Sequence, residues 1–161
     1  MGTNTQTSGG RFIRAWPVAV HLGVIALVLG AGIALGTSTS PGDWYSSLDK
    51  AWFTPPPAAF GPVWTVLYVL IGWVGARKLL YGGAGALWVG QMALNLAWTP
   101  IFFGLHWTAV GLAVILGMLV LILWFIATEW RRDRVSALMF VPYAVWVTLA
   151  SAVNAGVVWL N

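Results

Sequence analysis

The chain has 161 residues, of which 60% are hydrophobic and 7% are charged, and its formal net charge is +4. Soluble domains carry about 25% charged residues, so this composition excludes a water-coated globular protein and indicates a surface that faces lipid. Cysteine is absent, which excludes disulfides, thiol nucleophiles and thiolate metal sites. The few basic residues flank apolar segments, which favours membrane orientation over nucleic-acid binding as their role.

Five apolar stretches are long enough to cross a bilayer, which requires about 20 residues with internally satisfied backbone groups. They predict an all-α integral membrane protein, a bundle of five transmembrane helices that forms one domain over residues 16–161. A polar tail at residues 1–15 precedes it, and we expect this tail to be disordered. The expected helices are about 16–36, 60–80, 84–104, 107–130 and 135–160.

The connections differ in length. The links at residues 81–83 and 105–106 are short, so they predict antiparallel neighbours in an up-and-down bundle. The connection at residues 37–59 is long and contains Pro41-Gly42 and the run Pro55-Pro56-Pro57. Because proline interrupts helices, we expect this connection to form a non-helical, lid-like loop.

Basic residues predict the orientation in the membrane. Seven flank one side of the predicted bundle, and Lys50 stands alone on the other. The positive-inside rule therefore places the N-terminus inside a bacterial cell membrane, with the loop at 37–59 and the C-terminus outside. The seven are Arg11, Arg14, Arg77, Lys78, Arg131, Arg132 and Arg134.

A stripe of small residues marks the third predicted helix. Such stripes let helix backbones approach closely, either within one chain or between protomers. The sequence leaves both interpretations open, and the second is a homodimer through this helix. The stripe consists of Gly82, Ala86, Gly90, Ala93 and Ala97.

Three predicted helices carry polar and aromatic side chains spaced three or four residues apart, and therefore on one face of each helix. These are Trp64 and Tyr68 on the second helix, Gln91, Asn95, Trp98, Thr99 and Phe102 on the third, and Tyr143, Trp146, Ala150 and Asn154 on the fifth. In the predicted topology the three faces reach one depth beneath the long loop. They therefore predict a ligand pocket with a lid.

Purely structural roles are the alternative to a pocket for these residues. Tryptophan commonly anchors helices at the membrane interface, and the asparagines could simply bond neighbouring helices. His21 and His106 lie on opposite sides in this topology, so we expect no metal site. The carboxylates lie in loops or at helix ends, which argues against a proton-coupled transporter with buried acidic relays.

Four segments in order carry a specific resemblance over about residues 16–160. They are residues 44–56 of the long loop, 61–68 at the start of the second helix, 95–103 in the third, and 141–146 in the fifth with Asn154 downstream. With these segments the chain resembles the TspO/translocator family of tryptophan-rich sensory proteins. The resemblance implies a five-helix bundle, often a dimer, in membrane lipid.

The resemblance also implies a ligand and the residues that bind it. Members bind porphyrins such as protoporphyrin IX, as a ligand rather than a required cofactor, and benzodiazepine-type or isoquinoline compounds. It adds Tyr45 and Pro55 of the loop to the pocket residues found by spacing. In family members, tryptophans matching Trp64 and Trp146 are implicated in light-dependent porphyrin breakdown, which makes these two the candidate catalytic residues.

Three functions therefore remain open. The first is a tetrapyrrole-binding membrane protein that acts in porphyrin transport, sensing or stress regulation. The second is a light-dependent porphyrin-degrading enzyme. The third is a structural or regulatory membrane partner without a small-molecule site, in which the tryptophans serve only as anchors.

Overall fold

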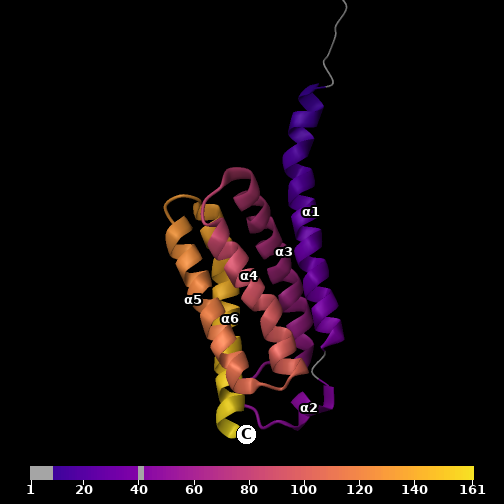
Figure 1. Ribbon diagram of the computed structural model, residues 1–161, viewed down its shortest axis with the longest axis vertical. Coiled ribbons are helices and arrows are strands. Elements are labelled where there is room, and N and C mark those ends of the chain that lie inside the picture. The colour runs from indigo at the N-terminus through magenta and orange to yellow at the C-terminus, as the bar shows by residue number, and fades with distance from the viewer. Residues whose placement is uncertain (1–8, 40–41) are drawn as a thin grey trace, which may run out of the picture.

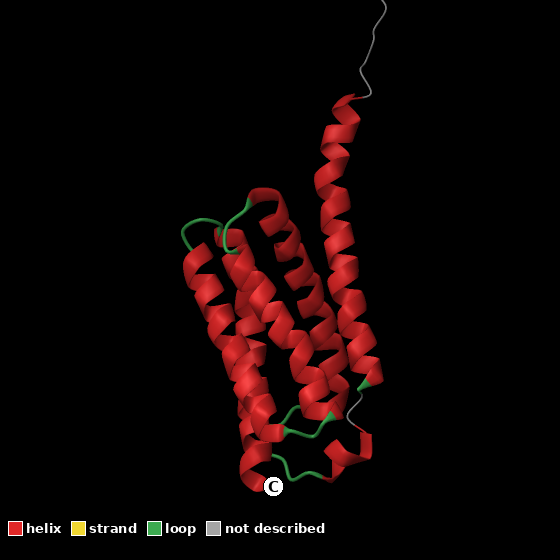
Figure 2. Cartoon of the chain, viewed as in Figure 1, coloured by secondary structure: helices red, strands yellow, loops and turns green. Residues whose placement is uncertain are grey.

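The computed structural model describes residues 9–39 and 42–161, with side chains from residue 16 onward. This described part is all-helical and contains no strand (Figure 2), which confirms the all-α prediction. Its elements are α1 (Gly9–Ser38), α2 (Gly42–Ser47), α3 (Pro57–Tyr81), α4 (Gly85–Thr99), the π-helical turn η1 (Pro100–Gly104), α5 (Thr108–Glu129) and α6 (Arg134–Leu160).

Helices α1, α3, α4, α5 and α6 run up and down beside one another (Figure 1). α1 packs along α3, α3 against α6, α6 against α5, and α5 against α4, while a smaller contact between α4 and α1 closes the ring. The N-terminal part of α1 projects beyond the bundle, and α2 lies across the opposite end, near the C-terminus (Figure 1). The short link at 105–106 joins the antiparallel neighbours α4 and α5, as predicted. The short link at 81–83 joins α3 and α4, which contact each other only slightly because they are not adjacent in this ring.

Four helices of the described chain are long and apolar enough to cross a membrane on their own: Trp16–Ser38, Pro57–Tyr81, Thr108–Glu129 and Arg134–Leu160. The segment expected as a single helix at 84–104 differs, because α4 has 15 residues and η1 continues it. Pro100 has no amide hydrogen to continue the α-helical pattern. The Leu105 amide instead donates to the Pro100 carbonyl, five residues back, at 2.9 Å, which is the π-helical spacing.

Two other boundaries differ from the sequence prediction. α1 begins at Gly9, so residues 9–15 of the expected tail are helical, while residues 1–8 lie outside the described part. The connection at 37–59 contains the short helix α2, although its prolines were expected to exclude a helix. The reason is that residues 42–47 contain no proline. α3 then begins at Pro57, where a missing amide hydrogen costs no helical hydrogen bond.

Two glycines bring α1 close to α3. A Cβ atom added at Gly72 of α3 would lie 2.6 Å from the Ile25 Cα of α1, and one added at Gly32 of α1 would overlap the Tyr68 ring of α3. Real Cβ atoms do not approach other atoms so closely. The helices therefore meet at a separation that only glycine permits.

This packing generates a stability prediction. Gly72→Ala should lower the free energy of unfolding by about 1–3 kcal/mol, the usual range for overpacking, because the added methyl group pushes against backbone. Thermal melting of the detergent-purified protein measures the loss. Gly30→Ala is the matched control, since an added Cβ there meets nothing within 4 Å. Equal melting temperatures for the two variants would contradict the close approach.

Candidate functional site

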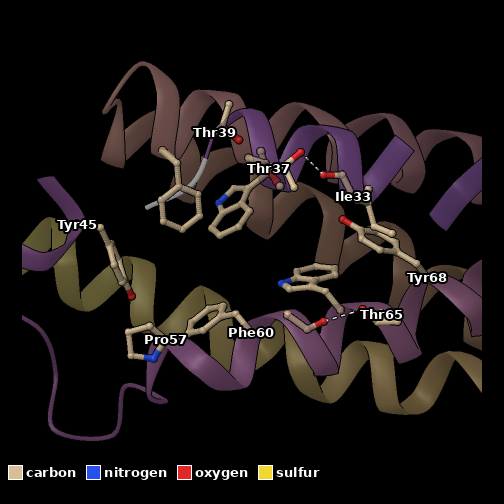
Figure 3. A pocket seen from close by; sticks show the side chains of 15 residues that line it. Ile33, Thr37, Thr39, Tyr45, Pro57, Phe60, Thr65 and Tyr68 are labelled. Atoms are coloured by element: carbon tan, nitrogen blue, oxygen red, sulfur yellow. Dashed lines mark hydrogen bonds between the residues drawn. The ribbon is translucent and has the colours of Figure 1, made fainter. Parts of the chain in front are cut away.

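A cavity of about 370 Å³ lies at the α2 end of the bundle, between α1, α3 and α4 (Figure 3). Ligand pockets typically measure about 300–1,000 Å³, so its size fits a small organic molecule. Its lining is Gly32, Ile33, Gly36, Thr37, Thr39, Tyr45, Pro57, Phe60, Gly61, Trp64, Thr65, Tyr68, Trp98, Thr99 and Phe103. None of these residues carries a charge at neutral pH.

Aromatic rings from opposite helices form its walls. On α3, the Trp64 and Tyr68 rings stack with centroids 5.3 Å apart and planes inclined by 28°. On the α4 side, the Trp98 ring meets the Phe103 ring edge-on at 5.6 Å. Flat, polarisable walls of this kind favour a flat aromatic ligand, which can stack on them or meet them edge-on.

Tyr45 closes the α2 end of the cavity. Only 4% of this residue is exposed, and its ring meets the Phe103 ring edge-on at 5.4 Å. Its hydroxyl points toward the Pro57 side of the cavity (Figure 3). Burial raises the pKa of the Tyr45 hydroxyl above its ordinary value, so the group stays protonated and can donate a hydrogen bond to a ligand.

Two contacts hold α2 and the following loop in place. The Trp44 ring stacks on the His106 ring at 4.0 Å between centroids, with planes inclined by 14°. The Asn161 side chain accepts from the Asp49 amide at 3.1 Å and donates to the Asp49 carbonyl at 3.1 Å. The tail of α6 therefore fastens the loop that carries Tyr45.

A chain of buried polar groups fixes the wall residue Tyr68. The Tyr68 hydroxyl donates to Asn95 Oδ1 at 3.2 Å, and Asn95 Nδ2 donates to the Tyr143 hydroxyl at 2.8 Å. That hydroxyl donates in turn to Gln91 Oε1 at 2.9 Å. Polar groups within a membrane need partners inside the protein. These hydrogen bonds supply such partners and link α3, α4 and α6.

A second polar pair fixes Trp98. Its indole Nε1 donates to Asn154 Oδ1 at 3.2 Å, and Asn154 Nδ2 donates to the Thr108 carbonyl at 2.9 Å. The Trp98 ring also stacks on the Phe102 ring at 5.3 Å. Asn154 and Phe102 thus hold the indole that lines the cavity and do not line it themselves.

The structure divides the expected pocket residues into those that line the cavity and those that do not. Tyr45, Trp64, Tyr68, Trp98 and Thr99 line it. Asn95, Phe102, Tyr143 and Asn154 lie outside the lining but are buried and contact lining residues. Pro55, Trp146 and Ala150 also lie outside the lining.

Trp146 nevertheless lies one residue away from the cavity. Its ring meets the Phe60 ring edge-on at 5.5 Å, and Phe60 belongs to the lining. The Trp146 Nε1 is buried and has no hydrogen-bond partner within the described part of the chain. Trp146 therefore contacts a lining residue without lining the cavity itself.

Sequence reasoning missed the contribution of α1. Its C-terminal end supplies Gly32, Ile33, Gly36 and Thr37 to the lining. These side chains are small or apolar, so no polar pattern marked them. The one available signal was the spacing of Gly32 and Gly36, four residues apart. Phe60, Gly61 and Thr65 of α3 and Phe103 of η1 also went unrecognised.

The two histidines lie in separate environments. His21 Nδ1 lies 2.6 Å from the Pro17 carbonyl, and its ring packs against Trp73 at 5.3 Å, while His106 stacks on Trp44. Within residues 9–39 and 42–161, no three His, Cys, Asp or Glu side chains gather closely enough to hold a metal ion. The described lining of the cavity offers aromatic rings, apolar surface and hydroxyl groups.

The sequence of this chain is similar to several known proteins. Residues 23–160 match the model of the TspO/MBR family. Protein CrtK of Rhodobacter capsulatus is 41% identical over 136 residues, which cover 80% of this chain and 84% of that protein. A tryptophan-rich sensory protein of Cereibacter sphaeroides is 36% identical, with 82% and 85% covered. The human translocator protein is 30% identical, with 69% and 70% covered.

Proposed function

The chain belongs to the TspO/MBR family of integral membrane proteins, and from that membership we propose that it binds tetrapyrroles such as protoporphyrin IX. The observation that carries the proposal is the uncharged, aromatic-walled cavity between α1, α3 and α4. The same cavity would accept hydrophobic benzodiazepine- or isoquinoline-type compounds. Binding there would serve the transport, sensing or stress regulation of porphyrins.

The wall geometry supports a flat ligand. The Trp64 and Tyr68 rings stack on each other on α3, and Asn154 holds Trp98 in a fixed orientation on α4. A porphyrin plane between the α3 and α4 walls would bury apolar area on both of its faces. The free Tyr45 hydroxyl, at the α2 end, would meet an acceptor atom at the ligand's edge.

We further propose that α4 and η1 together make a fifth membrane crossing. Residues 85–104 form a continuous helical segment, and a 20-residue helix spans about 30 Å, the thickness of the hydrocarbon core. The basic residues at the end of α3 and between α5 and α6 then favour an inside location for that end. The cavity, the loop at 37–59 and the C-terminus would lie on the outer side.

The small-residue stripe would serve a homodimer. Its first member, Gly82, lies in the turn before α4, and Ala86 and Ala93 on α4 are exposed in the single chain, so they are accessible to a second copy. A second copy packed against it would bring two α4 helices together. This arrangement would leave each cavity within one protomer, since α1 and α3 complete it.

Protoporphyrin IX titrated into the detergent-purified protein, followed by the porphyrin absorption band, tests the binding proposal. Wild type should saturate, and Trp64→Leu should bind about 2- to 12-fold more weakly, because it removes one aromatic contact, which contributes about 0.5–1.5 kcal/mol beyond its burial. Trp124→Leu is the matched control, since Trp124 is 59% exposed on α5 and absent from the lining. Binding that never saturates above empty micelles would refute the proposal.

A second candidate function, light-dependent porphyrin degradation, is favoured by one contact: Trp64 lines the cavity and would touch the ligand directly. Under this alternative, illumination of the bound complex destroys porphyrin, and Trp64→Phe slows the loss more than Trp146→Phe, because Trp146 stands behind Phe60. Absorbance after illumination, compared with a dark sample, measures it. Porphyrin recovered unchanged would leave binding alone as the function.

A further inference from the structure

A second hollow, of about 320 Å³, lies at the end of the bundle opposite the cavity, where α3 ends and α5 turns into α6. It is lined by the end of α3, the two glycines that follow, and the α5–α6 turn. The lining carries three basic side chains and two carboxylates, an excess of one positive charge. Arg131 and Arg134, which lie outside the lining, raise the excess at this end to three. The hollow and its charge play no part in the cavity described above.

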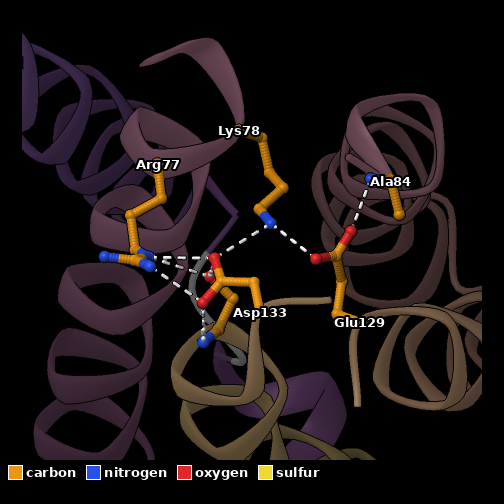
Figure 4. Close-up of polar contacts among 6 residues, drawn as sticks. Arg77, Lys78, Ala84, Glu129 and Asp133 are labelled. Atoms are coloured by element: carbon orange, nitrogen blue, oxygen red, sulfur yellow. Dashed lines mark hydrogen bonds and ion pairs between the residues drawn. The ribbon is translucent and has the colours of Figure 1, made fainter. Parts of the chain in front are cut away.

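Both carboxylates are already fully engaged within the protein (Figure 4). Glu129 is completely buried and accepts from Lys78 Nζ at 2.8 Å and from the Ala84 amide at 2.6 Å. Asp133 accepts from Arg77 Nη2 at 2.8 Å, Lys78 Nζ at 3.1 Å and the Ser136 hydroxyl at 2.6 Å. These bonds tie α3, α4, α5 and α6 together.

The charge on Asp133 is stable. Burial alone would raise the pKa of its carboxyl group, but hydrogen bonds from Arg77, Ser136 and Lys78 outweigh burial and hold this pKa well below its ordinary value. The group therefore remains an ionised acceptor that orients the Arg77 guanidinium. Glycine at position 83 makes room for the cluster, because an added Cβ would lie 2.5 Å from Glu129 Oε1.

Donors remain free toward the hollow. Arg132 forms no ion pair with any described residue, and Arg77 makes no hydrogen bond from Nη1 within the described part. Lys78 has three ammonium hydrogens, and its two carboxylate bonds use two of them. The site therefore presents cationic donors for which the described part of the chain supplies no further anionic partner.

The surroundings place this hollow at a lipid interface. Leu79 is 73% exposed and Tyr81 is 64% exposed at the end of α3, and Trp130 is 43% exposed at the end of α5. Aromatic side chains of this kind occupy the headgroup level of a bilayer. The Arg77 guanidinium lies 5.4 Å from the Tyr81 ring centroid, so the cationic donors share that level.

We propose that this hollow binds the phosphate of an anionic phospholipid headgroup. Arg132 and the free edge of Arg77 would donate to the phosphate oxygens, while Tyr81 and Leu79 would contact the upper part of the acyl chains. Basic pockets between membrane helices are known to bind such headgroups. The opposite end carries Asp43 and Asp49 against Lys50, so the preference belongs to one leaflet.

Native mass spectrometry of the full chain in detergent tests the site, with phosphatidylglycerol and phosphatidylcholine titrated separately. Phosphatidylglycerol should bind at least fivefold more tightly, and Arg132→Gln should remove about that factor, because it removes a charged donor that contacts the phosphate directly. Arg131→Gln is the matched control, with the same charge loss in the same turn but outside the lining. Lys50→Gln controls for the opposite end. Both should change phosphatidylglycerol affinity less than twofold.

Three results would overturn the proposal. Equal affinity for the two lipids would exclude a headgroup site, and equal losses in Arg131→Gln and Arg132→Gln would indicate diffuse attraction by the charged end. Soluble glycerol 1-phosphate binding as tightly as the lipid, and dependent on Arg132, would indicate a free-anion site instead. Protoporphyrin titration of the same variants should be unchanged, so failure here is distinguishable from failure of the tetrapyrrole proposal.

Discussion

The close approach of α1 to α3 is the contact on which the cavity depends. α1 joins the bundle chiefly through α3, and Gly32 lets the Tyr68 ring lie directly against the α1 backbone. Gly32 and Tyr68 both line the cavity, so this contact is one of its boundaries. From Gly32 to its C-terminal end, α1 forms one wall of the cavity, and Tyr45 of α2 closes the end of the cavity. A bulkier residue at position 32 would displace the ring and the wall together.

The position of Tyr68 depends in turn on hydrogen bonds between buried polar groups. Hydrocarbon offers no partner for a buried amide or hydroxyl, and the chain from Tyr68 through Asn95 and Tyr143 to Gln91 satisfies them across three helices. At the other end of the bundle, the charged side chains of Lys78 and Glu129 also bond each other and link two helices. The bundle is therefore fixed by polar contacts at two depths, with apolar packing between them.

The helix order, the short reversals and the aromatic residues of α3 and α4 could be predicted from the sequence, because hydropathy and helical spacing report which residues share a face. Spacing does not report what a face contacts. Asn154 and Trp98 were both expected to contact a ligand, and instead Asn154 lies outside the lining and accepts a hydrogen bond from Trp98. The α1 wall could not be predicted, because glycine, isoleucine and threonine in an apolar helix look like ordinary lipid-facing residues. The π-helical turn follows from Pro100, yet proline alone does not specify it.

The most direct test of the cavity as the tetrapyrrole site is to fill it from α1. Gly36 lines the cavity and an added Cβ there meets nothing within 4 Å, whereas Gly30, on the same helix, has equal room but is absent from the lining. Gly36→Phe should therefore bind protoporphyrin IX about tenfold more weakly than Gly30→Phe, which corresponds to a loss of about 1.4 kcal/mol in binding free energy. The affinity of Gly30→Phe should equal that of the wild type. Equal affinities in two folded variants would place the ligand elsewhere and contradict the account.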